Sequence, residues 1–296
     1  MSFLKLFKSE NVANNSESIW YENWQLLKKN KSAMFGLYII IFFVLIAIFA
    51  PVVAPFDPYA QNIDIRKLPF FSWPYILGTD DFGRDILSRI IYGARISLVI
   101  GFISVSISLI FGSFIGLISG FYGGLIDKIS MRIIDIMLAF PYILLTIVIV
   151  ALLGPTLLNA MIAIGIARLP QYARIMRASV LAEKAAEYVE AEKSLGVGNV
   201  ELMFRSILPN CLAPIIVQAT LGVGSAIIES AALSFLGLGA QPPTPEWGLM
   251  IASAREFVSS AWWIVTFPGI AILFVVLGFN LLGDGIRDVL DPRLKD

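Results

Sequence analysis

Two acidic residues, Asp135 and Glu229, stand inside long apolar stretches of the sequence, which makes them candidates for chemistry. An ionised carboxylate is costly in an apolar surrounding, so such groups usually face the interior of a helix bundle or a water-filled path. From either place, a carboxylate can contact a cationic group on a bound molecule. A buried structural hydrogen bond or a protonated carboxyl explains the same residues, and Arg132 is close enough in sequence to pair with Asp135. Both interpretations stay open at this stage.

Motifs for covalent catalysis, phosphate binding and metal binding are absent from the sequence. There is no GxxxxGK[ST] loop and no histidine, and the single cysteine, Cys211, excludes an internal disulfide and a Cys/His zinc cluster. No recognised motif supplies a nucleophile with a base and an orienting group, and no basic tract accompanies the net charge of zero. We therefore expect a protein that is not an enzyme, binds no cofactor or metal itself and does not bind nucleic acid.

The composition is that of an integral membrane protein, because 57% of the residues are hydrophobic, 15% are charged and the mean hydropathy is +0.80. A helix that crosses a bilayer needs about 20 mostly apolar residues. Windows of this kind predict six spans, at 33–54, 96–118, 132–153, 157–178, 212–236 and 262–282. The predicted fold class is therefore all-α, with six transmembrane helices. Pro141 and Pro268 fall inside two of the windows, where a proline kinks a helix.

The distribution of lysine and arginine predicts the orientation of these spans, because cytoplasmic connections usually carry the excess of basic residues. With six spans and a cytoplasmic N-terminus, sixteen of the 22 basic residues lie inside; without a span at 157–178, only eight do. The rule favours six spans with both termini cytoplasmic, and it places Arg168, Arg174 and Arg177 at the cytoplasmic end of a helix. The chain then divides into a cytoplasmic tail (1–32), a first transmembrane helix (33–54), an external loop (55–93) and a transmembrane core (94–296) that includes a cytoplasmic loop at 179–210.

Two local patterns add detail to this division. The external loop is expected to end in a short helix on the outer membrane face, because "GRDILSRIIYG" (83–93) has an apolar edge and Thr79 to Asp81 are suitable caps. In the core, Gly112, Gly116 and Gly120 follow the spacing that lets two membrane helices pack closely.

The stretch "EYVEAEKSLGVGNVELMFRSILPN" (187–210) lies in the predicted cytoplasmic loop and is polar for this chain. Its pattern predicts two short amphipathic helices, the first ending at Gly196 in a left-handed turn and the second capped by Asn199 and closed by Pro209. A loop that lies at the lipid headgroups would show similar amphipathicity, but such helices usually carry Lys and Arg. Residues 183–201 hold five Glu against two Lys, which favours a knob that fits a groove on a protein partner.

The same stretch resembles the EAA loop of the permease subunits of ABC importers, through Glu190, Ala191, Gly196 and the pair Leu208-Pro209. It departs from that pattern at Glu192, where alanine is usual, and at Ser206, where isoleucine is usual. Four further segments agree with the resemblance: "LGTDDFGRDILSRIIYGARISLVIG" (77–101), "MRIIDIMLAFP" (131–141), "ALSFLGLGAQPPTPEWGLMI" (232–251) and "GDGIRDVLDPRLK" (283–295). They are similar to the C-type permeases of dipeptide, oligopeptide and nickel importers, and most similar to the dipeptide group.

This resemblance implies the type I ABC importer permease fold, in which the EAA loop forms a coupling helix that docks into a cleft on the ATP-hydrolysing subunit. The residues that it assigns to ATPase coupling are Glu187, Tyr188, Glu190, Ala191, Gly196, Phe204, Leu208, Pro209 and Asn210. The implied partners are a homologous B-type permease, two ATP-binding subunits that hold ATP and Mg, an external substrate-binding protein, a peptide substrate and membrane lipid. The implied location is the cytoplasmic (inner) membrane of a bacterium.

The function that the resemblance implies is import of peptides by alternating access, with dipeptides as the expected substrate and with Asp135 and Glu229 as candidates for the translocation path. Nickel complexes, haem-like cargo and longer peptides are alternatives with the same architecture. An ion-coupled secondary transporter is an alternative of a different class, which would show repeat-related broken helices and a coupling-ion site.

Overall fold

The structure is a computed structural model that describes residues 15–290, with side chains described from Tyr21 onward. The regular elements of this part of the chain are all helices, which confirms the predicted all-α fold class. The α-helices are α1 (Asn15–Lys29), α2 (Lys31–Ile48), α3 (Ala50–Val53), α4 (Ile86–Ile107), α5 (Ser113–Tyr122), α6 (Gly124–Ala139), α7 (Tyr142–Leu153), α8 (Leu157–Lys184), α9 (Glu187–Ser194), α10 (Asn199–Glu201), α11 (Leu208–Asn210), α12 (Leu212–Phe235), α13 (Trp247–Ala254) and α14 (Trp263–Leu290). Two 3₁₀ turns, η2 (Ile63–Ile65) and η5 (Arg255–Phe257), and two π turns, η3 (Ser108–Gly112) and η4 (Leu202–Ile207), complete the list. Residues 1–14 of the predicted tail, and Arg293 and Lys295 of the predicted C-terminal segment, lie outside the described residues.

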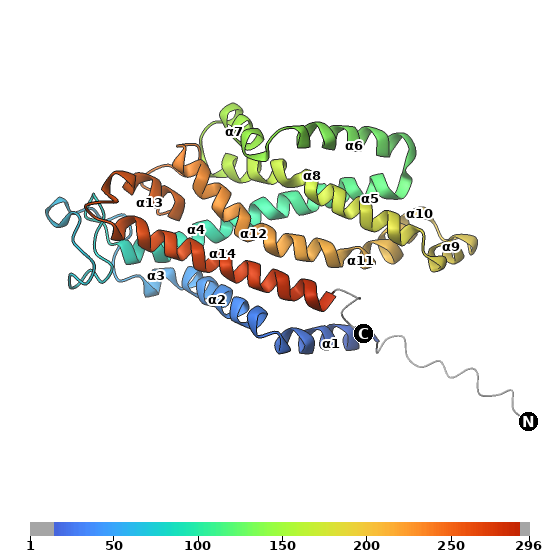
Figure 1. Ribbon diagram of the computed structural model, residues 1–296, viewed down its shortest axis with the longest axis horizontal. Helices are drawn as coiled ribbons and strands as arrows, with labels where there is room; N and C mark the ends of the chain where they lie inside the picture. The colour runs from blue at the N-terminus through green and yellow to red at the C-terminus, as the bar shows by residue number, and fades with distance from the viewer. Residues whose placement is uncertain (1–14, 291–296) are drawn as a thin grey trace, which may run out of the picture.

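The long helices form an elongated bundle (Figure 1). Helix α14 packs against both α2 and α12, α12 also contacts α4, and α4 and α5 lie along α8. The main apolar core runs between these helices and includes Phe43, Leu98, Ile164, Ile227 and Val275. The connection from α3 to α4 lies with α13 at one end of the bundle, whereas α1, α9 and α10 lie at the other. The predicted external and cytoplasmic loops are therefore at opposite ends.

Within residues 15–290, length and hydropathy identify four continuous helical stretches that can cross a membrane. They are Lys31–Ile48, Ile86–Tyr122, Leu212–Phe235 and Trp263–Leu290, and each overlaps one of the predicted windows. The window 157–178 lies in α8, which is helical throughout but does not qualify by composition, because Arg168, Pro170 and Arg174 follow its apolar first half. The orientation with six spans and cytoplasmic termini stays a prediction.

The window 132–153 is not one continuous helix, although the helices in it qualify together as a broken span or a re-entrant loop. It contains two helices, α6 and α7, whose axes differ by 95° across a break at Phe140 and Pro141. Proline has no N–H to donate, and it disfavours the helical conformation in the preceding residue, so Phe140 is extended with φ −91° and ψ 139°. Pro268, by contrast, lies inside the continuous helix α14.

The separate short helix predicted within 83–93 is absent from the described loop. Helix α4 begins at Ile86 and continues through η3 and α5 to Tyr122, so that the predicted surface helix is the first part of a 37-residue stretch. Asp85 caps this helix by accepting a hydrogen bond of 2.7 Å from the Ser88 amide, and Thr79 to Asp81 are not its caps. The apolar edge of 83–93 therefore belongs to the bundle, because no helix-breaking residue separates it from the following span.

The three glycines at 112, 116 and 120 pack their helix directly on α8, as their spacing predicts. A Cβ atom built on Gly116 would lie 2.3 Å from the Ala173 carbonyl oxygen and 2.8 Å from the Met176 Cβ atom. Gly112 and Gly120 meet α8 at similarly short distances. Close approach of two backbones thus holds α5 to α8.

Replacement of Gly116 by valine should therefore destabilise the bundle. The new side chain has no room against the α8 backbone, and overpacking of this kind typically costs about 1–3 kcal/mol, so we expect the thermal unfolding midpoint in detergent to fall by roughly 3–10 °C. Gly198→Ala is the matched control, since its Cβ would meet nothing within 4 Å and its φ of −67° suits alanine. An unchanged midpoint for Gly116→Val would contradict the packing described.

Candidate functional site

A helical knob, residues 187–207, projects from the end of the bundle and is formed by α9, α10 and η4 (Figure 1). Helix α8 ends at Lys184, and Ala186 is extended, which turns the chain into α9. Gly196 has φ +84°, and the Val197 amide bonds the Glu192 carbonyl at 3.2 Å. This is the left-handed turn predicted to end the first helix, and glycine adopts it without a Cβ clash.

The knob is held to the bundle by a second, smaller apolar core. Val189 of α9 and Leu202, Met203 and Ile207 of η4 are buried there. They pack with a group from α5, α8 and the start of α12 that includes Leu117, Phe121, Met176, Val180 and Ile215. The ammonium of Lys184 also donates a hydrogen bond of 2.5 Å to the Phe121 carbonyl oxygen. The knob is therefore attached to α5 and α8 along its inner side.

Two details of the predicted second helix are wrong. Gly198, not Asn199, is its N-cap, and no side chain caps it. Pro209 does not close the helix but lies in the first turn of α11, directly after the π turn η4. Proline is tolerated at the first turn of a helix because no intrahelical partner is needed for its missing N–H. The chain thus runs from the knob through α11 into α12, and only Cys211 separates α11 from α12.

A polar network fixes the inner end of the knob. The Tyr188 hydroxyl donates to the Glu183 carboxylate at 2.6 Å, and the Asn210 amide donates to Glu183, to Tyr188 and to the Ser206 carbonyl at 3.0–3.1 Å. Burial, and then the hydrogen bond to Glu183, raise the pKa of Tyr188 to about 12, so the hydroxyl keeps its proton at neutral pH. Tyr188 and Asn210 were predicted as coupling residues, and the structure gives them a supporting position.

The two positions at which the sequence departs from the EAA pattern contact each other. The Ser206 hydroxyl donates a hydrogen bond of 2.6 Å to the Glu192 carboxylate, from η4 to α9. A polar pair here joins the two arms of the knob, where alanine and isoleucine are usual. Nothing in the sequence pattern of either arm indicates this pair, because the residues are fourteen positions apart.

The outer side of the knob presents the other predicted coupling residues. Glu187, Glu190 and Ala191 of α9 are exposed, and Phe204 of η4 is 45% exposed. Leu195 and Val200, which are not among the predicted coupling residues, add exposed apolar surface at 84% and 63%. Leu208 instead packs against the smaller core. The knob therefore offers an acidic helix next to an apolar tip.

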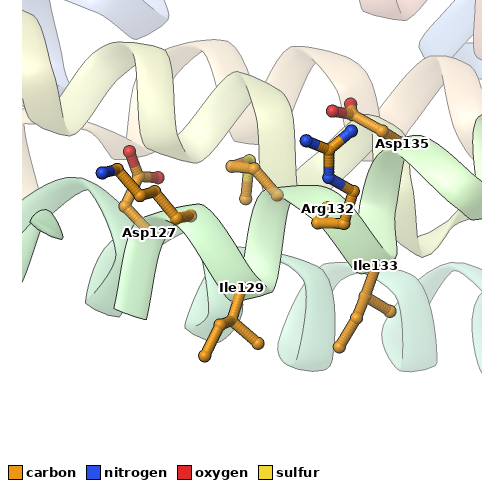
Figure 2. Close-up of a pocket in the computed structure, with 7 residues that line it drawn as sticks. Asp127, Ile129, Arg132, Ile133 and Asp135 are labelled. Atoms are coloured by element: carbon orange, nitrogen blue, oxygen red, sulfur yellow. The ribbon is translucent and has the colours of Figure 1, made fainter. Parts of the chain in front are cut away.

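Asp135 pairs with Arg174 of α8 at 2.6 Å, not with its sequence neighbour Arg132. Both side chains of the pair are about half exposed. On the same helix, Asp127 accepts two hydrogen bonds of 2.6 Å from Arg177 and another from Ser119. Figure 2 shows Arg132 and Asp135 beside an open cleft of about 670 Å³ along α6, with Ile129 and Ile133 pointing away from the carboxylates. The two ion pairs tie α6 to α8.

Glu229 is buried on α12 and forms an ion pair with Arg168 of α8. The Arg168 Nε atom lies 2.9 and 2.8 Å from the two carboxylate oxygens, and the side chains are 12% and 8% exposed. Arg168 therefore lies inside the bundle, whereas its sequence position suggested the cytoplasmic end of a helix. Glu229 also lines a small cavity of about 100 Å³ with Tyr142 and Thr146 of α7. The structure thus brings Glu229 together with a cation that the sequence analysis placed elsewhere.

The bundle has the type I ABC importer permease fold. It is similar to a solved structure of the MetNI methionine ABC transporter in inward-facing conformations, with a TM-score of 0.57, 17% sequence identity and coverage of 70% of this chain and 98% of that chain. The chain belongs to the family of binding-protein-dependent transport system inner membrane components, whose model matches residues 112–296. Residues 18–69 match the N-terminal transmembrane domain of oligopeptide transport permease C.

Curated relatives cover nearly the whole chain. The dipeptide transport system permease protein DppC of Haemophilus influenzae is 54% identical over 280 residues, covering 93% of this chain and 95% of its own. The di/tripeptide transport system permease protein DppC of Pseudomonas aeruginosa is 53% identical, with coverage of 93% and 92%. The dipeptide permease DppC of Escherichia coli K12 is 52% identical, with coverage of 93% of both chains. These relatives confirm the resemblance to C-type peptide permeases.

The Glu192–Ser206 contact predicts non-additive effects of substitution. Glu192→Ala and Ser206→Ala should each speed amide hydrogen exchange in 187–207, and the double variant should add little to either, with a coupling energy of about 1 kcal/mol. The Glu201–Arg205 pair is the matched control, because these side chains are 55% and 81% exposed and such surface pairs contribute little. Additive effects at Glu192 and Ser206 would show that the contact does not stabilise the knob.

Proposed function

We propose that this chain is the permease subunit of an ATP-driven importer of dipeptides. The knob is the observation that carries the proposal, because a rigid, acidic projection anchored on two long helices is suited to receive force from a partner protein. The substrate rests on the relatives, whose names specify dipeptides or di- and tripeptides at 52–54% identity.

The geometry supports a mechanical link from the knob to the interior of the bundle. Helix α8 enters the knob and α12 leaves it, and Arg168 and Glu229 join the same two helices about 25 Å further along, at a rise of 1.5 Å per residue. A tilt of the knob changes the spacing of α8 and α12 and loads this ion pair. We assign to the pair the role of a charged gate on the translocation path, which opens and closes during alternating access.

Asp135 has a different role in this proposal. Its partner Arg174 is on α8 and both side chains are about half exposed, so the pair contributes little stabilisation. The less exposed pair on the same two helices, Asp127–Arg177, is the one that keeps α6 in register with α8. We therefore place Glu229, and not Asp135, on the path.

The partners in the proposal are those that membership of the permease family implies. A homologous B-type permease completes the path, two ATP-binding subunits hold ATP and Mg and receive the knob, and an external substrate-binding protein delivers the peptide at the opposite end. The chain is not itself catalytic. The complex lies in the inner membrane of a bacterium, with the knob and both termini in the cytoplasm.

Reversal of charge at Glu190 tests the coupling role. Glu190→Lys places a cation on the exposed side of α9 and should lower dipeptide uptake, and the ATPase copurified with the complex, by at least about tenfold, which corresponds to roughly 1.4 kcal/mol at the interface. Asp64→Lys is the control, because Asp64 is exposed in the loop at the other end of the bundle. Normal uptake and normal ATPase capture by Glu190→Lys would remove the basis of the proposal.

The gate is tested by exchanging the charges of the buried pair. Loss of one partner from a buried ion pair costs about 3–5 kcal/mol, so Glu229→Gln alone is expected to destabilise the chain. The double variant Arg168→Glu/Glu229→Arg keeps an ion pair between α8 and α12, and it should fold while uptake stays at least about tenfold below that of the wild type, because the charges facing the path are reversed. Restored uptake in the folded double variant would show that the pair is only a clamp.

A further inference from the structure

An apolar groove lies beside the end of the bundle that carries the knob. Its volume is about 410 Å³, and it is walled by α1, the start of α12 and the end of α14. Apart from Asn23, the lining is apolar, and it includes Trp24 and Leu27 of α1, Leu212 and Ile216 of α12, and Ile286 and Leu290 of α14. Trp24 remains 42% exposed and Leu212 39% exposed, so this surface is only partly covered by the described chain.

The groove lies at the depth where lipid headgroups meet the hydrocarbon. Helix α2 has 18 residues and starts at Lys31, directly after α1, so it is about 27 Å long and matches a hydrocarbon core of about 30 Å. Lys31 therefore marks one edge of the hydrocarbon region. Leu212 begins the span of α12 and Leu290 ends that of α14 at the same end of the bundle. The groove thus opens where an acyl chain enters the bilayer.

Basic side chains follow the groove-lining residues of α1 in the sequence. Lys28 and Lys29 end α1, Lys31 begins α2, and all three are exposed. Among the described side chains, none of the three forms an ion pair with an acid, and the nearby Asp288 accepts a hydrogen bond from Asn30. Lys28 lies over the Trp24 ring, 5.3 Å from its centroid, so its ammonium is held above the groove wall.

We propose that this groove binds an anionic phospholipid, with an acyl chain against Trp24, Ile216 and Ile286 and its phosphate beside Lys28, Lys29 and Lys31. An apolar lining with unpaired cations at one rim is complementary to a lipid of negative charge, because basic side chains near a membrane surface bind anionic headgroups. A protein partner is a weaker match, since it would have to bury three lysines at the level of the headgroups.

The cleft along α6 differs from the groove in the charges that line it. It is larger, but it is lined by Asp127 and Asp135 as well as by Lys128 and Arg132, so its charges compensate one another. It lies on the far side of the bundle from α1 (Figure 1). This cleft lacks the predominantly apolar lining that the groove has.

The experiment is native mass spectrometry of the complete transporter purified in mild detergent, titrated with phosphatidylglycerol or with phosphatidylcholine of the same acyl chains. The wild type should retain phosphatidylglycerol preferentially. Lys28→Gln/Lys29→Gln should weaken that binding about 25-fold, since each lysine near an anionic headgroup contributes about a fivefold factor. Lys128→Gln/Arg132→Gln, which removes two cations from the α6 cleft, should leave it unchanged.

A second variant tests the groove itself. Ala213→Phe fills the wall between α12 and α14 and should reduce retention of both lipids without removing any charge. Equal retention of the two lipids by the wild type, or retention that neither the lysine nor the Ala213 variant alters, would overturn the proposal. So would a gain in lipid retention on deletion of residues 1–14, which would identify that segment of the chain as the occupant. Lipid retention is measured independently of peptide uptake, so failure of the lipid proposal would leave the importer assignment unaffected.

Discussion

The small apolar core that seats the knob on the bundle is the interaction on which the rest of the structure depends. Val189, Leu202 and Ile207 are buried against α5 and α8, so the knob is continuous with the packed interior and is not a free loop. Close-packed interiors transmit displacement because they compress little. A partner that grips the exposed acids on the outer side therefore acts on α8 and α12, and not only on residues 187–207.

Helix α8 is the structural axis of the protein. It carries three arginines, each paired with an acid on another helix, and it also meets the glycines of α5 and η3. Burial separates the pairs by importance. Arg168 and Glu229 are largely buried, and a buried charge without a partner is costly. Arg174 and Asp135 are half exposed, so their pair contributes little. Of these two pairs, Arg168–Glu229 is therefore the one whose disruption would cost more stability.

The bilayer accounts for features that would be faults in a soluble protein. Large apolar side chains such as Leu152, at 81% exposure, and Ile110, at 59%, lie on the outside of the bundle, where lipid or a second permease can cover them. The break between α6 and α7 also reflects the bilayer, in which backbone polar groups must be hydrogen-bonded within the protein. Pro141 removes a backbone donor, and the chain forms two separate helices at 95°, each with its own internal hydrogen bonds.

The sequence by itself determined the helical class, the apolar spans, the left-handed turn at Gly196 and the close packing at Gly112, Gly116 and Gly120. These are local properties, because hydropathy, a positive φ and the spacing of small residues are set within a few turns of chain. It also supported the family through the EAA loop and four longer segments. The sequence predicted caps at Thr79 to Asp81 and a separate helix in 83–93, whereas Asp85 caps a helix that continues into the span.

Only the tertiary structure decided which charges meet. Glu229 finds Arg168 across 61 residues, Asp135 finds Arg174 across 39, and Ser206 finds Glu192 across 14. Sequence spacing instead suggested Arg132 for Asp135 and an exposed helix end for Arg168. The physical reason is that a side chain's partner depends on which helices lie side by side and in what register. Those are set by the burial of whole helix faces, which no local pattern in the chain specifies.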